Sequence, residues 1–120
     1  MTKDCDKSQV QGISFGGQMH GLVVLDDEDE VIRPAILWND GRTTKETDYL
    51  NTVIGKETLS KYTANIAFAG FTAPKILWMK ENEPELFAKI NKIMLPKIIW
   101  HTNYLEHFVR IIQMLPACYC

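Results

Sequence analysis

The order of secondary-structure signals in this sequence predicts a mixed α/β fold. Short apolar runs typical of strands occupy residues 10–15 and 22–25, and helix-like segments follow between residues 43 and 90. An apolar run at residues 93–95 then returns to the strand pattern. A chain of 120 residues is long enough for one small domain and too short for two.

The first two strands are predicted to flank a tight glycine connection, because residues 16–21 contain three glycines. The acidic residues 26–30 precede a further apolar pair, Val31 and Ile32, and predict a solvated hairpin turn. The alternative, a metal site at this turn, lacks the alternating ligands and central glycine of a calcium loop.

Two helical segments are predicted in the middle of the chain. Thr43 or Thr44 can cap a helix that runs to about residue 54, and Gly55 ends this helix. Residues 57–62 are predicted to form another helical turn or two. The apolar stripe of the first helix consists of Leu50, Val53 and Ile54.

Two more helices are predicted before the last strand. Thr72 can cap a helix that carries Pro74 in its first turn, where a missing N–H costs little. Its apolar side consists of Ile76, Leu77 and Met79. Pro84 begins a further helix that runs to about residue 90.

Composition excludes several classes of partner and site. Thirteen basic residues against 15 acidic ones give a net charge of -2, which leaves no basic footprint for nucleic acid. No apolar run approaches the roughly 20 residues of a membrane span, and the polar start resembles no signal peptide, so we expect a soluble, cytoplasmic protein. Cys5, Cys118 and Cys120 are an odd count without metal-ligand spacing, so we expect no disulfide framework and no zinc site.

Polar groups concentrate in four segments at the ends of predicted elements, where small-molecule sites gather. A polyol needs hydrogen-bonding groups for its hydroxyls and an apolar wall for its carbons. The segments are 17–21, 38–42, 69–75 and 95–97. The predicted hydrogen-bonding residues are His20, Asn39, Asp40 and Arg42, and the predicted wall is Met19, Trp38 and Phe71.

The residues alone leave a simpler interpretation open. His20 in a glycine loop can be a turn residue that bonds to the backbone, and Trp38 and Trp78 can belong to the core. The sequence contains no GxxxxGK[ST] phosphate loop, and the three histidines do not form a metal set.

The same four segments resemble the N-terminal domain of the FGGY family of carbohydrate kinases, nearly continuously from about Ser8 to Lys97. The strings that carry the resemblance are QMHG, PAILWNDGR and GFTAPK, in matching order and spacing. Met19-His20 resembles the pentulose kinases, including xylulokinases, whereas glycerol kinases have Arg-Glu there. The resemblance therefore implies a ketopentose, D-xylulose, rather than glycerol.

The resemblance implies a ribonuclease-H-like, actin-like ATPase fold and transfer of the ATP γ-phosphate to the 5-hydroxyl of D-xylulose, with Mg²⁺. It places six residues at the sugar: Met19, His20, Trp38, Asn39, Asp40 and Arg42. The family's phosphate-facing Asp-x-Gly-Thr hairpin, catalytic aspartate and nucleotide domain match no part of this sequence. We therefore expect no catalytic residue or metal ligand here, no turnover, and no ATP or Mg²⁺ binding by this chain alone.

The resemblance divides the chain into three parts: residues 1–7 outside it, the family slice 8–97, and a tail 98–120. Reading the tail's codons one base out of step permits the family-like string DYMAYKLSGTFCTDYSDASGML, so the tail is predicted to be an out-of-frame translation. The alternative is a genuine C-terminal helix, since Tyr104, Phe108 and Ile111 show helical spacing together with Ile112.

The sequence alone leaves other functions open. The slice can serve as a non-catalytic sugar-binding or interaction module, or belong to a kinase for another pentulose such as ribulose. It can also be a remnant that neither binds sugar nor folds well.

Overall fold

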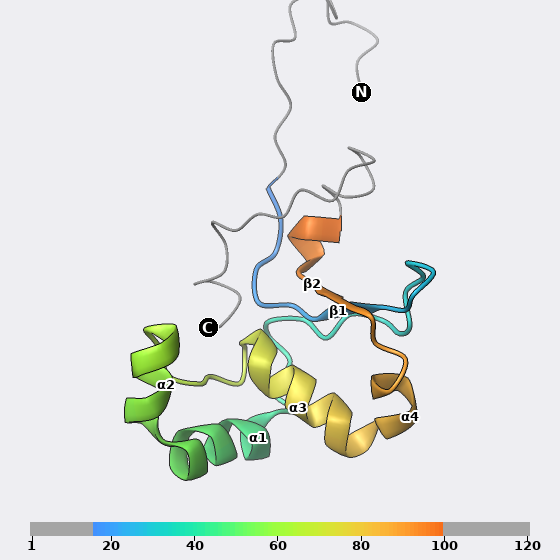
Figure 1. Ribbon diagram of the computed structural model, residues 1–120. Coiled ribbons are helices and arrows are strands. Elements are labelled where there is room, and N and C mark those ends of the chain that lie inside the picture. Colours follow the sequence, from blue (N-terminus) through green and yellow to red (C-terminus); the bar gives the residue numbers. More distant parts are fainter. Residues whose placement is uncertain (1–15, 100–120) are drawn as a thin grey trace, which may run out of the picture.

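The structure, a computed structural model, describes residues 16–99 (Figure 1). Several predictions lie outside these residues and are not addressed by them. They are the strand at residues 10–15, the three cysteines, His101, His107 and the tail from residue 100 onward.

The described sheet has two short antiparallel strands. β1 (Val23–Leu25) pairs with β2 (Lys92–Met94), so that Val23 lies opposite Met94. The predicted strands at residues 22–25 and 93–95 are confirmed, although β1 begins one residue later and β2 begins and ends one residue earlier than expected. Isolated bridges from Leu22 to Ile36 and from Leu25 to Val31 extend the pairing beyond these strands.

The acidic stretch at residues 26–30 forms the predicted turn. The Asp26 N–H donates to the Glu30 carbonyl at 3.1 Å, and the Asp26 carboxylate accepts the N–H groups of Glu28 and Glu30. Asp29 takes a positive φ of 67° and pairs with Lys92 on β2. The turn therefore directs one of its carboxylates to its own backbone and another to a lysine of the neighbouring strand.

The first predicted helix is present but changes form halfway. It consists of α1 (Thr44–Tyr49) and a π-helical segment, η2 (Leu50–Gly55), and α2 (Lys56–Thr63) follows after Gly55 at φ 92°. The predicted apolar stripe is wrong, because Val53 and Ile54 are 67% and 42% exposed. The stripe assumed a period of 3.6 residues, which a π-helix with its wider turn does not keep.

The start of α1 also differs from the prediction. Thr43 is the N-cap residue, but its hydroxyl donates to the Ala69 carbonyl at 2.9 Å instead of capping the helix. Thr43 is fully buried, so its side chain is directed to a distant loop rather than to its own helix.

α3 (Thr72–Asn82) and α4 (Pro84–Phe87) follow, and Pro74 lies in the first turn of α3 as predicted. Thr72 is not the cap, since the N-cap residue is Phe71 and the Thr72 hydroxyl donates to the His20 carbonyl at 3.2 Å. α4 begins at Pro84 as predicted but ends three residues before residue 90, where the chain turns toward β2.

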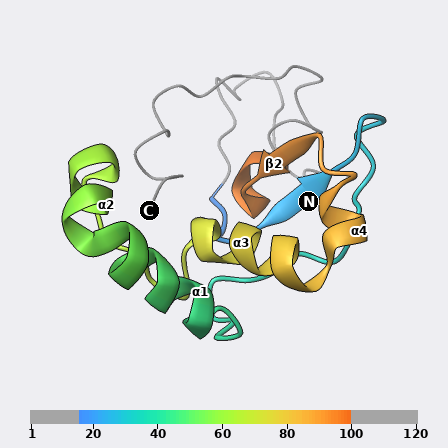
Figure 2. The same ribbon diagram turned by 60° about the horizontal axis from the view of Figure 1, so that its bottom comes forward.

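The core lies on both faces of the sheet because successive side chains of a strand point to opposite faces. Leu22 and Val24 pack with Ile36 and Met79, on the side that α3 and α4 cover in Figures 1 and 2. On the other side, Val23, Leu25 and Met94 form a second cluster with the partly buried Ile98 and Ile99 packed against it. This sheet and α3 form the frame on which the four predicted segments are placed.

Candidate functional site

The glycine loop at residues 16–21 packs tightly against residues 95–97. A Cβ added to the buried Gly21 would lie 2.7 Å from Cγ of Pro96, and one added to Gly17 would lie 3.0 Å from Cα of Lys97. Such distances exclude larger side chains at these positions unless the neighbour moves. The first and fourth predicted segments are therefore in direct contact.

The loop at residues 69–71, which begins the third segment, contacts the second segment. A Cβ added to Gly70 would lie 2.8 Å from the backbone oxygen of Trp38. The Thr43 hydroxyl bonds to Ala69 of the same loop at 2.9 Å. The loop thus lies against the Trp38 backbone and is joined to the start of α1.

His20 joins the first and third segments. Its ring stacks on the Phe71 ring, with centroids 4.5 Å apart, and its carbonyl accepts the Thr72 hydroxyl. Its φ of 62° is a turn conformation, as the simpler interpretation expected. In the described structure, however, the buried Nδ1 atom has no hydrogen-bond partner, so the ring is not satisfied by the backbone at this nitrogen.

The predicted apolar wall is exposed in part. Met19 is 50% exposed and Trp38 56% exposed, and Asn39 also faces solvent. The interpretation of Trp38 as a core residue is therefore wrong. Trp78, on α3, is partly buried against the core as that interpretation expected.

Asp40 and Arg42 form a pair within one short segment. Nε and Nη2 of Arg42 donate to the two carboxylate oxygens of Asp40 at 2.9 and 2.8 Å. The Arg42 guanidinium carbon also lies 4.8 Å from the centre of the Trp78 ring. The hydrogen bond from Arg42 lowers the pKa of Asp40, and Asp40 in turn raises the pKa of Arg42.

These contacts form two groups. His20 is held by Phe71 and Thr72, whereas Arg42 is held by Asp40 and Trp78. Lys75 is near both groups, because it bonds to the loop that contains Phe71 and its charge acts on Asp40.

Lys75 is the residue whose role the sequence reasoning missed, although it lies inside one of the four segments. Its Nζ donates to the carbonyls of Ala69 and Phe71, each at 3.0 Å, and to that of Gly70. The residue is fully buried, and this burial lowers its pKa to about 8, against the opposing effect of the Asp40 charge. The available signal was its spacing, since Lys75 lies four residues before the buried Met79 and shares its helix face.

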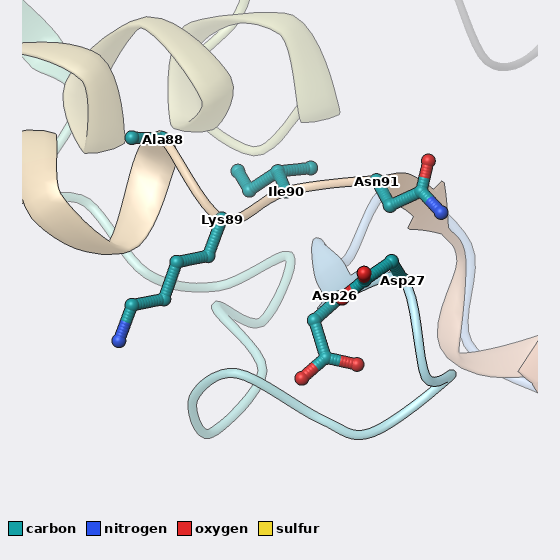
Figure 3. Close-up of a pocket in the computed structure, with 6 residues that line it drawn as sticks. All are labelled: Asp26, Asp27, Ala88, Lys89, Ile90 and Asn91. Carbon is teal, nitrogen blue, oxygen red and sulfur yellow. The ribbon is translucent and has the colours of Figure 1, made fainter.

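Pockets in the described structure include one at Phe71 and one away from the predicted site residues. One of about 180 Å³ is apolar and includes Phe71 in its lining. It is lined by Leu50, Leu59, Thr63, Ile66, Ala67, Phe71, Ala73 and Pro74. The other, of about 430 Å³, lies between the acidic turn and residues 88–91, where the side chains diverge (Figure 3). The second pocket contains none of the predicted site residues.

Two features are absent from residues 16–99. Within that range no three histidine, cysteine or acidic side chains gather closely enough to hold a metal ion. Nor does that range contain a helix long and apolar enough to cross a membrane.

Comparison with known proteins identifies the family. The N-terminal domain of the FGGY family of carbohydrate kinases matches residues 1–109. The chain is 56% identical over 89 residues to a xylulose kinase of Lactococcus lactis subsp. lactis, a match that covers 74% of this chain and 18% of that protein. It is 49% identical over 90 residues to a xylulose kinase of Staphylococcus xylosus, with 75% and 19% covered.

A solved structure agrees with these sequences. The xylulose kinase from Bifidobacterium adolescentis superimposes with a TM-score of 0.73 at 31% identity, covering 77% of this chain and 21% of that one. The chain thus spans between 18% and 21% of the length of these relatives. The predicted fold class, part of a ribonuclease-H-like N-terminal domain, is confirmed. This chain belongs to the FGGY family of carbohydrate kinases.

Proposed function

We propose that this chain carries the sugar-binding side of a kinase that transfers the γ-phosphate of ATP to the 5-hydroxyl of D-xylulose. The similarity to proteins named xylulose kinases supports this proposal. The observation that carries it is His20, whose buried Nδ1 lacks a partner in the described structure where the predicted segments meet. A buried nitrogen without a partner is unfavourable, and a sugar hydroxyl would satisfy it.

The neighbouring groups suit a sugar in complementary ways. The Asp40 carboxylate, whose pKa is lowered, stays ionised at neutral pH and accepts hydrogen bonds from hydroxyls. Met19 and Trp38 offer exposed apolar surface to the carbon face of the sugar. We assign Arg42 to the orientation of Asp40 and Asn39 to solvent-side hydroxyls. All six lie in residues 8–97, which we propose as the sugar side.

Kinases of this family depend on ATP, generally with a divalent metal. The described residues offer no ligand set for Mg²⁺. Asp40 is the only carboxylate within the motif strings QMHG, PAILWNDGR and GFTAPK, but its bidentate bond to Arg42 makes it a poor base. We therefore assign sugar binding to the slice at residues 8–97, and neither proton abstraction nor phosphate binding.

Calorimetric titration of the purified chain with D-xylulose tests the proposal. We expect saturable binding, weakened by about 1–3 kcal/mol in His20→Ala because a polar contact to the sugar is lost. Tyr62→Ala is the control, since Tyr62 is 77% exposed on α2 and should leave the affinity unchanged.

Two outcomes contradict this proposal. If His20→Ala keeps the affinity and only lowers the melting temperature, His20 is a turn residue and not a sugar ligand. If glycerol or D-ribulose binds as tightly as D-xylulose, the specificity for D-xylulose is wrong.

A further inference from the structure

Lys75 holds a loop with every donor that its side chain possesses. An ammonium group has three N–H donors and no acceptor. The three carbonyls of Ala69, Gly70 and Phe71 accept them, at 3.0 Å for the first and third. Lys75 has no exposed surface and makes none of the ion pairs in the described part of the chain. Three consecutive peptide carbonyls are therefore turned inward toward one buried cation.

The loop that Lys75 holds contacts two of the predicted site residues, His20 and Trp38. Phe71 stacks on the His20 ring, and Thr72, the next residue, bonds to the His20 carbonyl. Gly70 lies against the backbone oxygen of Trp38. A displacement of this loop would therefore move Phe71 away from the His20 ring and Gly70 away from the Trp38 backbone at the same time.

We propose that Lys75 is a positioning residue for sugar binding: by holding the loop at residues 69–71 it keeps Phe71 against His20 and so sets the orientation of the imidazole. The inference rests on the proposed sugar-binding function. Lys75 acts through the loop and does not itself touch the sugar. Small misplacements of a binding group have large effects, so a residue outside the site can control affinity.

The test compares Lys75→Met with Lys45→Met in the full chain. Methionine keeps most of the aliphatic stem of Lys75 but removes all three donors. Lys45 is the matched control, because its exposed ammonium pairs with Glu81 at 3.3 Å and does not reach the loop. We expect Lys75→Met to weaken D-xylulose binding by about 10- to 100-fold, and Lys45→Met to leave it unchanged.

The second readout is the NMR signal of the His20 ring, which does not depend on sugar. A stacked aromatic ring shifts the resonances of its neighbour, and Phe71→Leu gives the position of those signals without the stack. We expect Lys75→Met to move the His20 signals toward their position in Phe71→Leu. Lys45→Met should leave them in place.

The outcomes separate this inference from the proposed function. Absence of saturable D-xylulose binding to the unaltered chain contradicts the function, and the link from Lys75 to His20 is then decided by the NMR signals alone. Unmoved His20 signals in a folded Lys75→Met chain overturn the inference, as does unchanged sugar affinity.

If Lys75→Met does not fold, Gly70→Ala decides instead. Its new Cβ would press on the Trp38 oxygen and displace the same loop while Lys75 stays intact. Moved His20 signals and weaker sugar binding then support the inference, and no change in either overturns it.

Discussion

Gly21 shows at the scale of one residue how the site is assembled. It is buried between His20 and β1, and a Cβ there would lie 2.7 and 2.9 Å from two carbons of the Pro96 ring. A proline ring cannot rotate away as the end of a flexible side chain can. The close approach of these two segments therefore depends on the absence of a side chain at Gly21.

We expect Gly21→Ala to lower the free energy of unfolding by about 1–3 kcal/mol, the usual cost of overpacking. Urea denaturation followed by circular dichroism measures the change. Gly41→Ala is the matched control, because nothing lies within 4 Å of a Cβ added there. Equal stability of the two variants would show that the loop and Pro96 are not packed as described.

At the scale of the element, α3 serves two purposes along its length. Its first turn carries Thr72 and Lys75, both buried, which bond to the site loops. One turn later Met79, with no exposed surface, packs with Leu22 and Ile36 in the core. Because the same helix makes both sets of contacts, its packing in the core also fixes the position of the loop beside His20.

We expect Met79→Ala to lower the free energy of unfolding by about 2–5 kcal/mol, because it leaves a cavity in this core. Val53→Ala on η2 should change it by about 0.5 kcal/mol or less, since Val53 is 67% exposed. Chemical denaturation of both variants measures the difference. A large effect of Val53→Ala would restore the apolar stripe predicted from helical spacing.

At the scale of the whole molecule, buried Lys75 links stability to pH. Its pKa is about 8 in the folded chain against 10.5 for an ordinary lysine. Below pH 8 Lys75 is protonated in both the folded and the unfolded chain, so its contribution to the free energy of unfolding does not change with pH. Between about pH 8 and 10.5 the unfolded chain binds more protons, so the contribution of Lys75 to the free energy of unfolding rises with pH.

The measurement is urea denaturation at several pH values from 7 to 10.5. We expect the difference in unfolding free energy between the unaltered chain and Lys75→Met to grow in favour of the unaltered chain above pH 8. Other titrating groups are shared by the two proteins and cancel in this comparison. A difference that stays constant with pH would mean that Lys75 keeps an ordinary pKa when folded.

Sequence patterns predicted the elements whose signals are local. Both described strands, the acidic turn and the start of α4 at Pro84 follow from apolar runs, charge and proline placement, and the structure confirms them. The predicted caps failed for a non-local reason. The hydroxyls of Thr43 and Thr72 bond to Ala69 and to His20, which are 26 and 52 residues away in the sequence.

The sequence by itself determined the α/β class, the family and the four polar segments, because each of these depends on residues close together along the chain. Only the tertiary structure decided which side chains in those segments are available to a ligand. It exposed Trp38, paired Arg42 with Asp40, and buried Lys75 against three carbonyls. Burial and hydrogen-bond partners arise from contacts between distant segments, and neither composition nor spacing encodes which donor reaches which acceptor.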